Sequence, residues 1–187
     1  MTYLSKGIVY RGSTEQLLKI SHCGCEYVLK GREAALWLNG RYGISSTQSP
    51  VEEQAIGHLH RMGLVECVED SSSVSVYRIL SRCILCPTLS KRASLLLHGL
   101  EKRVMTWLTK AGLHLTLAEL VYLIEHDIAP GEQFLYASNR QTLIEQIYTV
   151  DTIADCILET QMESAAGRDT VVLAVLQLLK RKKIVIL

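Results

Sequence analysis

The stretch from Ser49 to Leu80 constrains the fold more than any other part of this chain. Its first four residues, Ser-Pro-Val-Glu, form a capping box with proline at the first helical position, where its missing N–H is not needed. Apolar residues then recur at helical spacing as far as Met62, and Gly63 suits the left-handed residue that ends many helices. The pattern predicts a helix over residues 51–62.

Two β-like runs follow this helix. Residues 64–68 and 74–80 are rich in apolar and β-branched side chains, and the polar residues 69–73 lie between them. Two such runs around a polar tip are typical of a β-hairpin. We therefore predict a helix followed by a two-stranded hairpin.

Composition and charge narrow the class of protein. The chain has 187 residues, 48% apolar and 21% charged, which fits one large or two small globular domains. The net charge of +1 argues against strong nonspecific nucleic-acid binding, although acidic residues elsewhere can offset a local basic face. The first residues do not resemble a signal peptide, and no apolar run approaches the roughly 20 residues of a membrane span. We expect a cytoplasmic protein that does not bind membranes.

The rest of the chain adds short strands and helices. Residues 7–30 contain two or three short strands with a turn at Gly24, and residues 32–42 form a helix. Because Pro87 disfavours a helix through that point, we place a domain boundary there, between residues 1–87 and 88–187. The second half is predicted to contain helices over residues 89–111, from Thr116 to about 127, over 139–148, 152–162 and 169–182, and a final strand over 184–187.

The two halves repeat one another weakly. Each has a tryptophan-bearing helix early, around Trp37 and Trp107, and a helix followed by a strand late. Five apolar positions recur at a constant offset: Val51, Ala55, Ile56, Leu59 and Leu64 match Val171, Val175, Leu176, Leu179 and Ile184. Amphipathic helices also match by chance, so a duplication and a coincidence both stay open. The predicted fold class is mainly α with small β-hairpins (α+β), in two similar units.

The capped helix with its hairpin resembles the winged-helix superfamily, over residues 27–80 and more loosely over 90–187. The resemblance implies two winged-helix-like domains in tandem that bind double-stranded DNA, with one helix in the major groove and the wing on the backbone. Carried over, the reading helix is 51–62, with His58, His60 and Arg61 as contacts. The implied role is a DNA-binding transcriptional regulator, and we expect a homodimer formed through residues 89–111 and 184–187.

Four carboxylates of the first half argue for another partner. Glu52 and Glu53 on the reading helix, with Glu69 and Asp70 at the wing tip, would repel phosphate. The alternative function is a protein- or peptide-binding adaptor that uses this acidic winged helix. The early strands are also similar to small winged domains that hold leader peptides by strand addition.

The second half carries more cations. Lys91, Arg92, Lys102 and Arg103 lie on the helix over 89–111. The predicted nucleic-acid contacts of this half are at the two ends of the last helix: Arg168, Lys180, Arg181, Lys182 and Lys183. Cations at the C-terminus of a helix also interact favourably with its dipole, so a solvated helix end is the alternative interpretation.

Evidence for catalytic or metal chemistry is sparse. Two cysteine pairs, Cys23 with Cys25 and Cys83 with Cys86, could together supply four thiolates to a structural zinc ion, but buried or free thiols are the interpretation we favour. The sequence contains no glycine-rich phosphate loop, no G-x-S-x-G elbow and no H-E-x-x-H motif. We therefore predict a protein without a cofactor that is not an enzyme.

Overall fold

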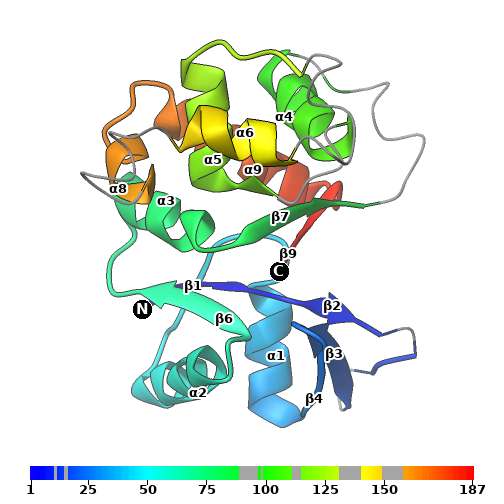
Figure 1. Ribbon diagram of the computed structural model, residues 1–187. Helices are drawn as coiled ribbons and strands as arrows, with labels where there is room; N and C mark the ends of the chain where they lie inside the picture. The colour runs from blue at the N-terminus through cyan, green and yellow to red at the C-terminus, as the bar shows by residue number, and fades with distance from the viewer. Residues whose placement is uncertain are drawn as a thin grey trace.

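A computed structural model describes residues 1–10, 12–14, 17–88, 97, 99–110, 115–130, 140–148 and 158–187. Within these ranges the chain forms eight helices and three small, three-stranded antiparallel sheets. The first sheet lies across the middle of the molecule, with the helices α1 (Gly31–Asn39) and α2 (Pro50–Arg61) on one side (Figure 1). The helix α3 (Ser73–Ser81) and the helices that follow it lie on the other side. The predicted α+β class is confirmed.

The described elements of residues 1–81 are six strands and three helices: β1 (Thr2–Ser5), β2 (Ile8–Val9), β3 (Leu18–His22), β4 (Cys25–Leu29), α1 (Gly31–Asn39), β5 (Ser45–Ser46), α2 (Pro50–Arg61), β6 (Val65–Val68) and α3 (Ser73–Ser81). The described elements from residue 84 onwards are β7 (Ile84–Pro87), α4 (Gly99–Lys110), β8 (Leu115–Thr116), α5 (Leu117–Glu125), α6 (Arg140–Ile147), α8 (Leu158–Met162), α9 (Arg168–Lys180) and β9 (Ile184–Ile186). No helix among the described residues is both long enough and apolar enough to span a lipid bilayer.

Two of the three sheets have the same topology. Their strand orders are β5-β1-β6 and β8-β7-β9, so the strand that comes first in the chain is central in each. The register also matches, because Tyr3 pairs with Ser45 and Cys67 while Leu85 pairs with Leu115 and Ile186. The third sheet, β2-β3-β4, is inserted between β1 and α1. The chain therefore contains two units that share an order of strand, helix, strand, helical segment and strand, with a single helix before the last strand in the first unit and α5, α6, α8 and α9 there in the second.

The helices before the last strand of each unit end in the same way. Gly63 and Lys182 both adopt a left-handed conformation, with φ of 76° and 57°. The next N–H closes a six-residue loop in each case, from Leu64 to the Leu59 carbonyl at 3.0 Å and from Lys183 to the Leu178 carbonyl at 2.9 Å. This is a Schellman motif. It pairs Leu64 with Lys183, so the match of Leu64 with Ile184 expected from the sequence is wrong by one residue.

The predicted second strand of the hairpin is also wrong. Residues 73–81 form α3, and β6 pairs with β1 instead. The Ser72 side chain caps α3 by accepting from the Ser75 N–H at 3.2 Å, and the Ser72 N–H donates to Asp70. Helical spacing then directs Tyr77 and Leu80 into the interior. No wing is therefore present at residues 69–80.

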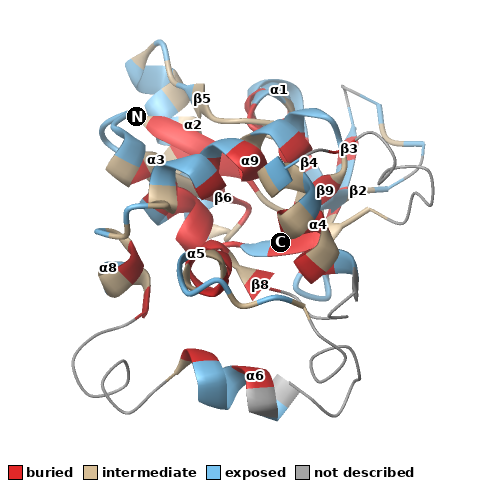
Figure 2. Ribbon diagram, turned by 90° about the horizontal axis from the view of Figure 1, so that it is seen from above, coloured by how far each residue is buried: buried red, intermediate tan, exposed pale blue. Residues whose placement is uncertain are grey.

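The central strand β1 lies between two hydrophobic clusters. Tyr3 packs in the cluster of the first half, with the buried side chains of Trp37 and Leu59. Leu4, which points to the opposite face of the sheet, packs in the larger cluster with Tyr77. Helix α5 is buried along most of its length, whereas α9 has one buried and one exposed side (Figure 2).

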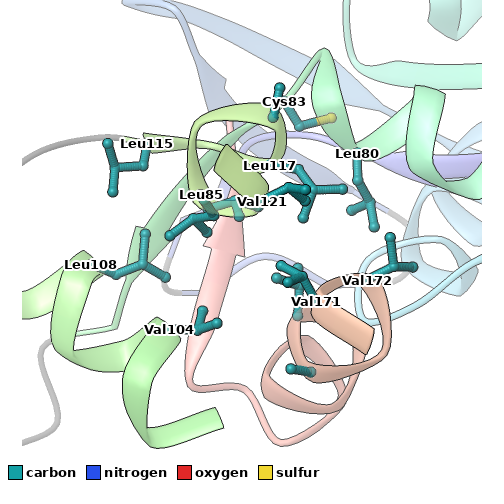
Figure 3. Packing of buried hydrophobic residues seen from close by; sticks show 14 of the residues in the cluster. Leu80, Cys83, Leu85, Val104, Leu108, Leu115, Leu117, Val121, Val171 and Val172 are labelled. Atoms are coloured by element: carbon teal, nitrogen blue, oxygen red, sulfur yellow. The ribbon is translucent and has the colours of Figure 1, made fainter. Parts of the chain in front are cut away.

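The larger cluster combines elements from both sides of the predicted boundary. Leu80 of α3 and Leu85 of β7 converge with Val121 of α5 and Val171 of α9 (Figure 3). Helix α3 precedes residue 87 but packs with the helices that follow it. Independent folding of residues 1–87 and 88–187 stays a prediction.

The burial of α2 gives a test of the fold. Leu59 is fully buried, so Leu59→Ala should lower the free energy of unfolding by about 2–5 kcal/mol, as large-to-small changes in a core do. Val51→Ala, on the exposed side of the same helix, is the control and should cost less than about 0.5 kcal/mol. Denaturant unfolding measures both. A cost for Leu59→Ala no greater than that of the control would contradict the packing described.

Candidate nucleic-acid interface

The basic run of residues 180–183 follows the end of α9. Lys180, Arg181 and Lys182 are exposed and Lys183 is half-buried. The left-handed backbone at Lys182 turns the chain towards β9, and the Thr88 hydroxyl donates to the carbonyls of Lys182 and Lys183 at 3.0 and 2.9 Å. The four cations therefore surround the helix end and do not share one helical face.

The two predicted arginine contacts of this half already have partners. Arg181 forms an ion pair with Glu101 of α4, with 2.6 Å between Nη1 and Oε2. Arg168 donates to the Asp169 carboxylate at 2.9 Å and to the backbone carbonyl of Glu163. This hydrogen bond from Arg168 lowers the pKa of Asp169. Both guanidinium groups connect parts of the fold, which leaves the lysines as the better candidates for an external anion.

The other cations of the second half add little to this surface. Arg103 of α4 is paired with Asp127 at 2.8 Å, and Lys102 is exposed. Lys91 and Arg92 lie outside the described residues.

The predicted contacts of the first half are held by their own neighbours. His58 Nδ1 lies 2.6 Å from Glu33 Oε1, and His60 Nδ1 lies 2.9 Å from the Val65 carbonyl. Arg61 is exposed at the end of α2. Helix α2 lies at the end of the molecule opposite the helices of the second half, so these residues are not gathered with the basic end of α9 (Figure 1).

The acidic residues of the first half also have local roles. Glu52 accepts from the Gln48 N–H at 2.6 Å at the start of α2, and Glu53 pairs with the terminal amine of Met1 at 3.4 Å. Asp70 accepts from the Ser72 N–H, and hydrogen bonding from the Ser75 side chain and from Ser72 lowers the pKa of Asp70. The acidic surface expected for a protein partner is therefore partly committed to stabilising α2 and α3.

A basic cluster does form at the junction of the two halves, around Tyr42. The Arg41 guanidinium lies 4.8 Å from the centroid of the Tyr42 ring and 5.8 Å from that of Trp37. The Lys182 ammonium, from the other half, lies 4.8 Å from the same Tyr42 ring. Within the described part of the chain, neither cation forms an ion pair. We call Arg41, Tyr42 and Lys182 the junction cluster.

The energies within the junction cluster are small and of opposite sign. Each exposed cation–π contact stabilises by about 0.5–1 kcal/mol. The two charges lie at most about 10 Å apart, so their repulsion in water is at least roughly 0.4 kcal/mol. The cluster can therefore form without an anion, and an anion placed there would gain attraction from both cations.

Arg41 and Tyr42 are not among the contacts predicted from the sequence. They stand between Gly40 and Gly43 just after α1, where a basic and an aromatic side chain, both half-buried, follow one another in a turn. That pairing is a usable signal for contact with nucleic acid. Their closeness to Lys182, far away in the chain, could not be inferred locally.

The four cysteines considered for zinc are not brought together. Cys23 and Cys25 are exposed at the β3–β4 turn, whereas Cys83 and Cys86 are buried next to and within β7. Among the residues that the structure describes, no group of three or more His, Cys, Asp or Glu side chains is arranged to hold a metal ion. Burial raises the pKa of the Cys83 thiol to about 12, and the thiol donates to the Ile79 carbonyl. Cys83 is therefore a core residue.

The segment expected to form a dimer is partly internal. Ile184 and Ile186 of β9 are buried in the larger cluster, and β9 pairs with β7. These two side chains are not available to a second subunit. The oligomeric state itself stays a prediction.

Comparison with known proteins adds no relationship: no family model, curated protein or solved structure matches this chain.

The cysteine assignment can be tested by alkylation. In the native protein, iodoacetamide should modify the exposed Cys23 and Cys25 far faster than Cys83, because the reactive species is the thiolate and burial keeps Cys83 protonated. Peptide mass mapping identifies the labelled sites. In denaturant all three should react, which serves as the control. Equal labelling of Cys23 and Cys83 in the folded protein would show that Cys83 is not a core thiol.

Proposed function

We propose that this chain is a non-enzymatic DNA-binding regulator, built from two units related to the winged helix, the first of which has the helix α3 in place of the second strand of the wing. Its contact surface is α9 and the lysines at the end of α9. In each unit the last helix precedes the last strand, the position of the reading helix in the superfamily that the sequence resembles. The equivalent helix of the first unit, α2, is a poor reader because its histidines are already bonded.

The observation that carries this proposal is the exposed stripe along α9. Thr170, Leu173, Gln177 and Lys180 are all exposed, and their spacing of three and four residues puts them on one side of the helix. Leu173 is 61% exposed, which is unusual for a leucine in a well-packed helix. Hydroxyl, amide and methyl groups are those that read base edges in the major groove, and the lysines that follow supply phosphate contacts.

Salt dependence tests the proposal. The affinity of the protein for a labelled duplex should fall linearly with salt on logarithmic axes. Lys180→Ala with Lys183→Ala should reduce that slope by about 0.9 per lost phosphate contact. Arg181→Ala is not used because it would leave Glu101 without its partner.

A matched double variant provides the control for charge. Lys19→Ala with Lys30→Ala removes the same charge from exposed positions beside the inserted sheet and should leave the slope unchanged. Absence of duplex binding by the parent protein at low salt would contradict the proposal. An equal effect of both double variants would show that only net charge matters.

One observation favours the second candidate function, a peptide-binding adaptor. The turn at Cys23 and Gly24 has positive φ at both residues, as in a two-residue type I′ hairpin, so His22 and Cys25 form a hydrogen-bonded pair. The alternation along β4 then directs the N–H and C=O groups of Glu26 and Val28 away from β3. In the described sheet β4 is an edge strand, which an extended peptide could join.

The adaptor function can be tested at Val28. A peptide selected from a displayed library for binding to the protein should lose affinity for Val28→Pro, because proline removes the outward N–H without disturbing the pairing with β3. Val28→Ala keeps that N–H and is the control. Equal binding to both variants would exclude strand addition at β4.

A further inference from the structure

The junction cluster brings together cations from the two halves of the chain. Arg41 and Tyr42 follow the first helix of unit one, and Lys182 follows the last helix of unit two. Both charged groups lie 4.8 Å from the Tyr42 ring centroid. The halves are also tied nearby, since the Gly7 N–H donates to the Ile186 carbonyl of β9 at 2.8 Å. The cluster therefore depends on how both units are placed.

The backbone at Lys182 is a second and independent observation. Its left-handed conformation is one that glycine adopts without cost and that lysine does not favour. The equivalent residue of the first unit is Gly63, with a φ of 76°. The same helix ending thus carries glycine in one unit and a strained lysine in the other. Backbone strain of this kind is concentrated at functional sites. Among the described residues other than glycine, it is shared only by Cys23 and Asp127, with φ of 49° and 51°.

We infer that Arg41, Tyr42 and Lys182 form a clamp for one backbone phosphate of the bound nucleic acid, so that the ligand contacts both units at once. The inference rests on the proposed function. The Arg41 guanidinium donates in a planar fork and the Lys182 ammonium acts as a point charge, and both suit phosphate oxygens. Tyr42 is a positioning residue that holds the two cations in place through its ring.

A phosphate of a polymer fits this site better than a free anion does. Lys180 and Lys183 continue the basic surface beyond the cluster along the end of α9. A chain of phosphates could meet these cations in succession, each contact releasing counterions. An isolated phosphate would use the junction cluster alone.

The decisive variant is Lys182→Gly. It removes the charge and relaxes the left-handed residue, so the melting temperature should not fall, whereas duplex affinity at low salt should drop about threefold to tenfold with a shallower salt slope. Arg41→Ala should weaken binding by a similar factor. Because both cations hold one phosphate, the double variant should lose less than the product of the two single effects.

Two further variants separate charge from position. Lys182→Arg keeps the charge and should retain most of the affinity. Tyr42→Leu keeps both cations and should weaken binding with the salt slope nearly intact, because the same charges remain but are held less firmly. Arg32→Ala, an exposed arginine at the other end of α1, is the matched control for Arg41→Ala and should bind as the parent does.

The outcomes distinguish this inference from the proposed function. If changes at Lys180 and Lys183 flatten the salt slope while Lys182→Gly and Arg41→Ala do not, the clamp is wrong and the DNA-binding function stands. If the parent protein binds no duplex, both are wrong. NMR titration of the Tyr42 resonances separates the two ligands. If inorganic phosphate shifts these resonances in the parent protein but not in Lys182→Gly, and a DNA duplex shifts them in neither, the site binds a free anion and the assignment to nucleic acid is overturned.

Discussion

Both halves of the molecule depend on the two-sided burial of β1. All four residues of this strand are buried, and their alternation sends Tyr3 into one hydrophobic cluster and Leu4 into the other. Just after the strand, Lys6 pairs with Glu66 of β6 at 2.8 Å, with side chains only 11% and 13% exposed. Removing one member of such a largely buried ion pair is destabilising, because the other charge is then buried without a partner. The position of this strand therefore fixes how the two units sit together, and with it the approach of Lys182 to Tyr42.

The sequence predicted best those elements whose signals are local. The capping box at Ser49 and the glycine at position 63 mark the two ends of α2, and Gly24 marks the β3–β4 turn. The strand predicted over residues 74–80 was wrong because the valines there alternate as in a strand. Ser72 and Asp70 just before them carry a capping signal that favours a helix. These residues form a helix because they are buried against α5 and α9. Contacts so far apart in the chain cannot be inferred from the sequence around residues 74–80.

The candidate interface shows the same division. The basic run at residues 180–183 was visible in the sequence, but the commitment of Arg181 to Glu101 was not. Arg41 and Tyr42 became candidates only because the fold places them beside Lys182. The equivalent helix ends of the two units have different neighbours. The His22 ring of the inserted sheet lies 4.0 Å from the position that a Cβ atom at Gly63 would take, whereas Lys182 lies against Tyr42.

The pairing of β1 with β6 has a consequence for the order in which the chain folds. The β3–β4 hairpin joins residues adjacent in sequence and can form within microseconds. Strand β1 must instead wait until α2 has been completed, because Ser5 meets Val65 across a long intervening loop. Sheets of such high contact order nucleate slowly. Strand β1 is thus among the last elements to reach its final position, and until then its apolar side chains stay open to association with other chains.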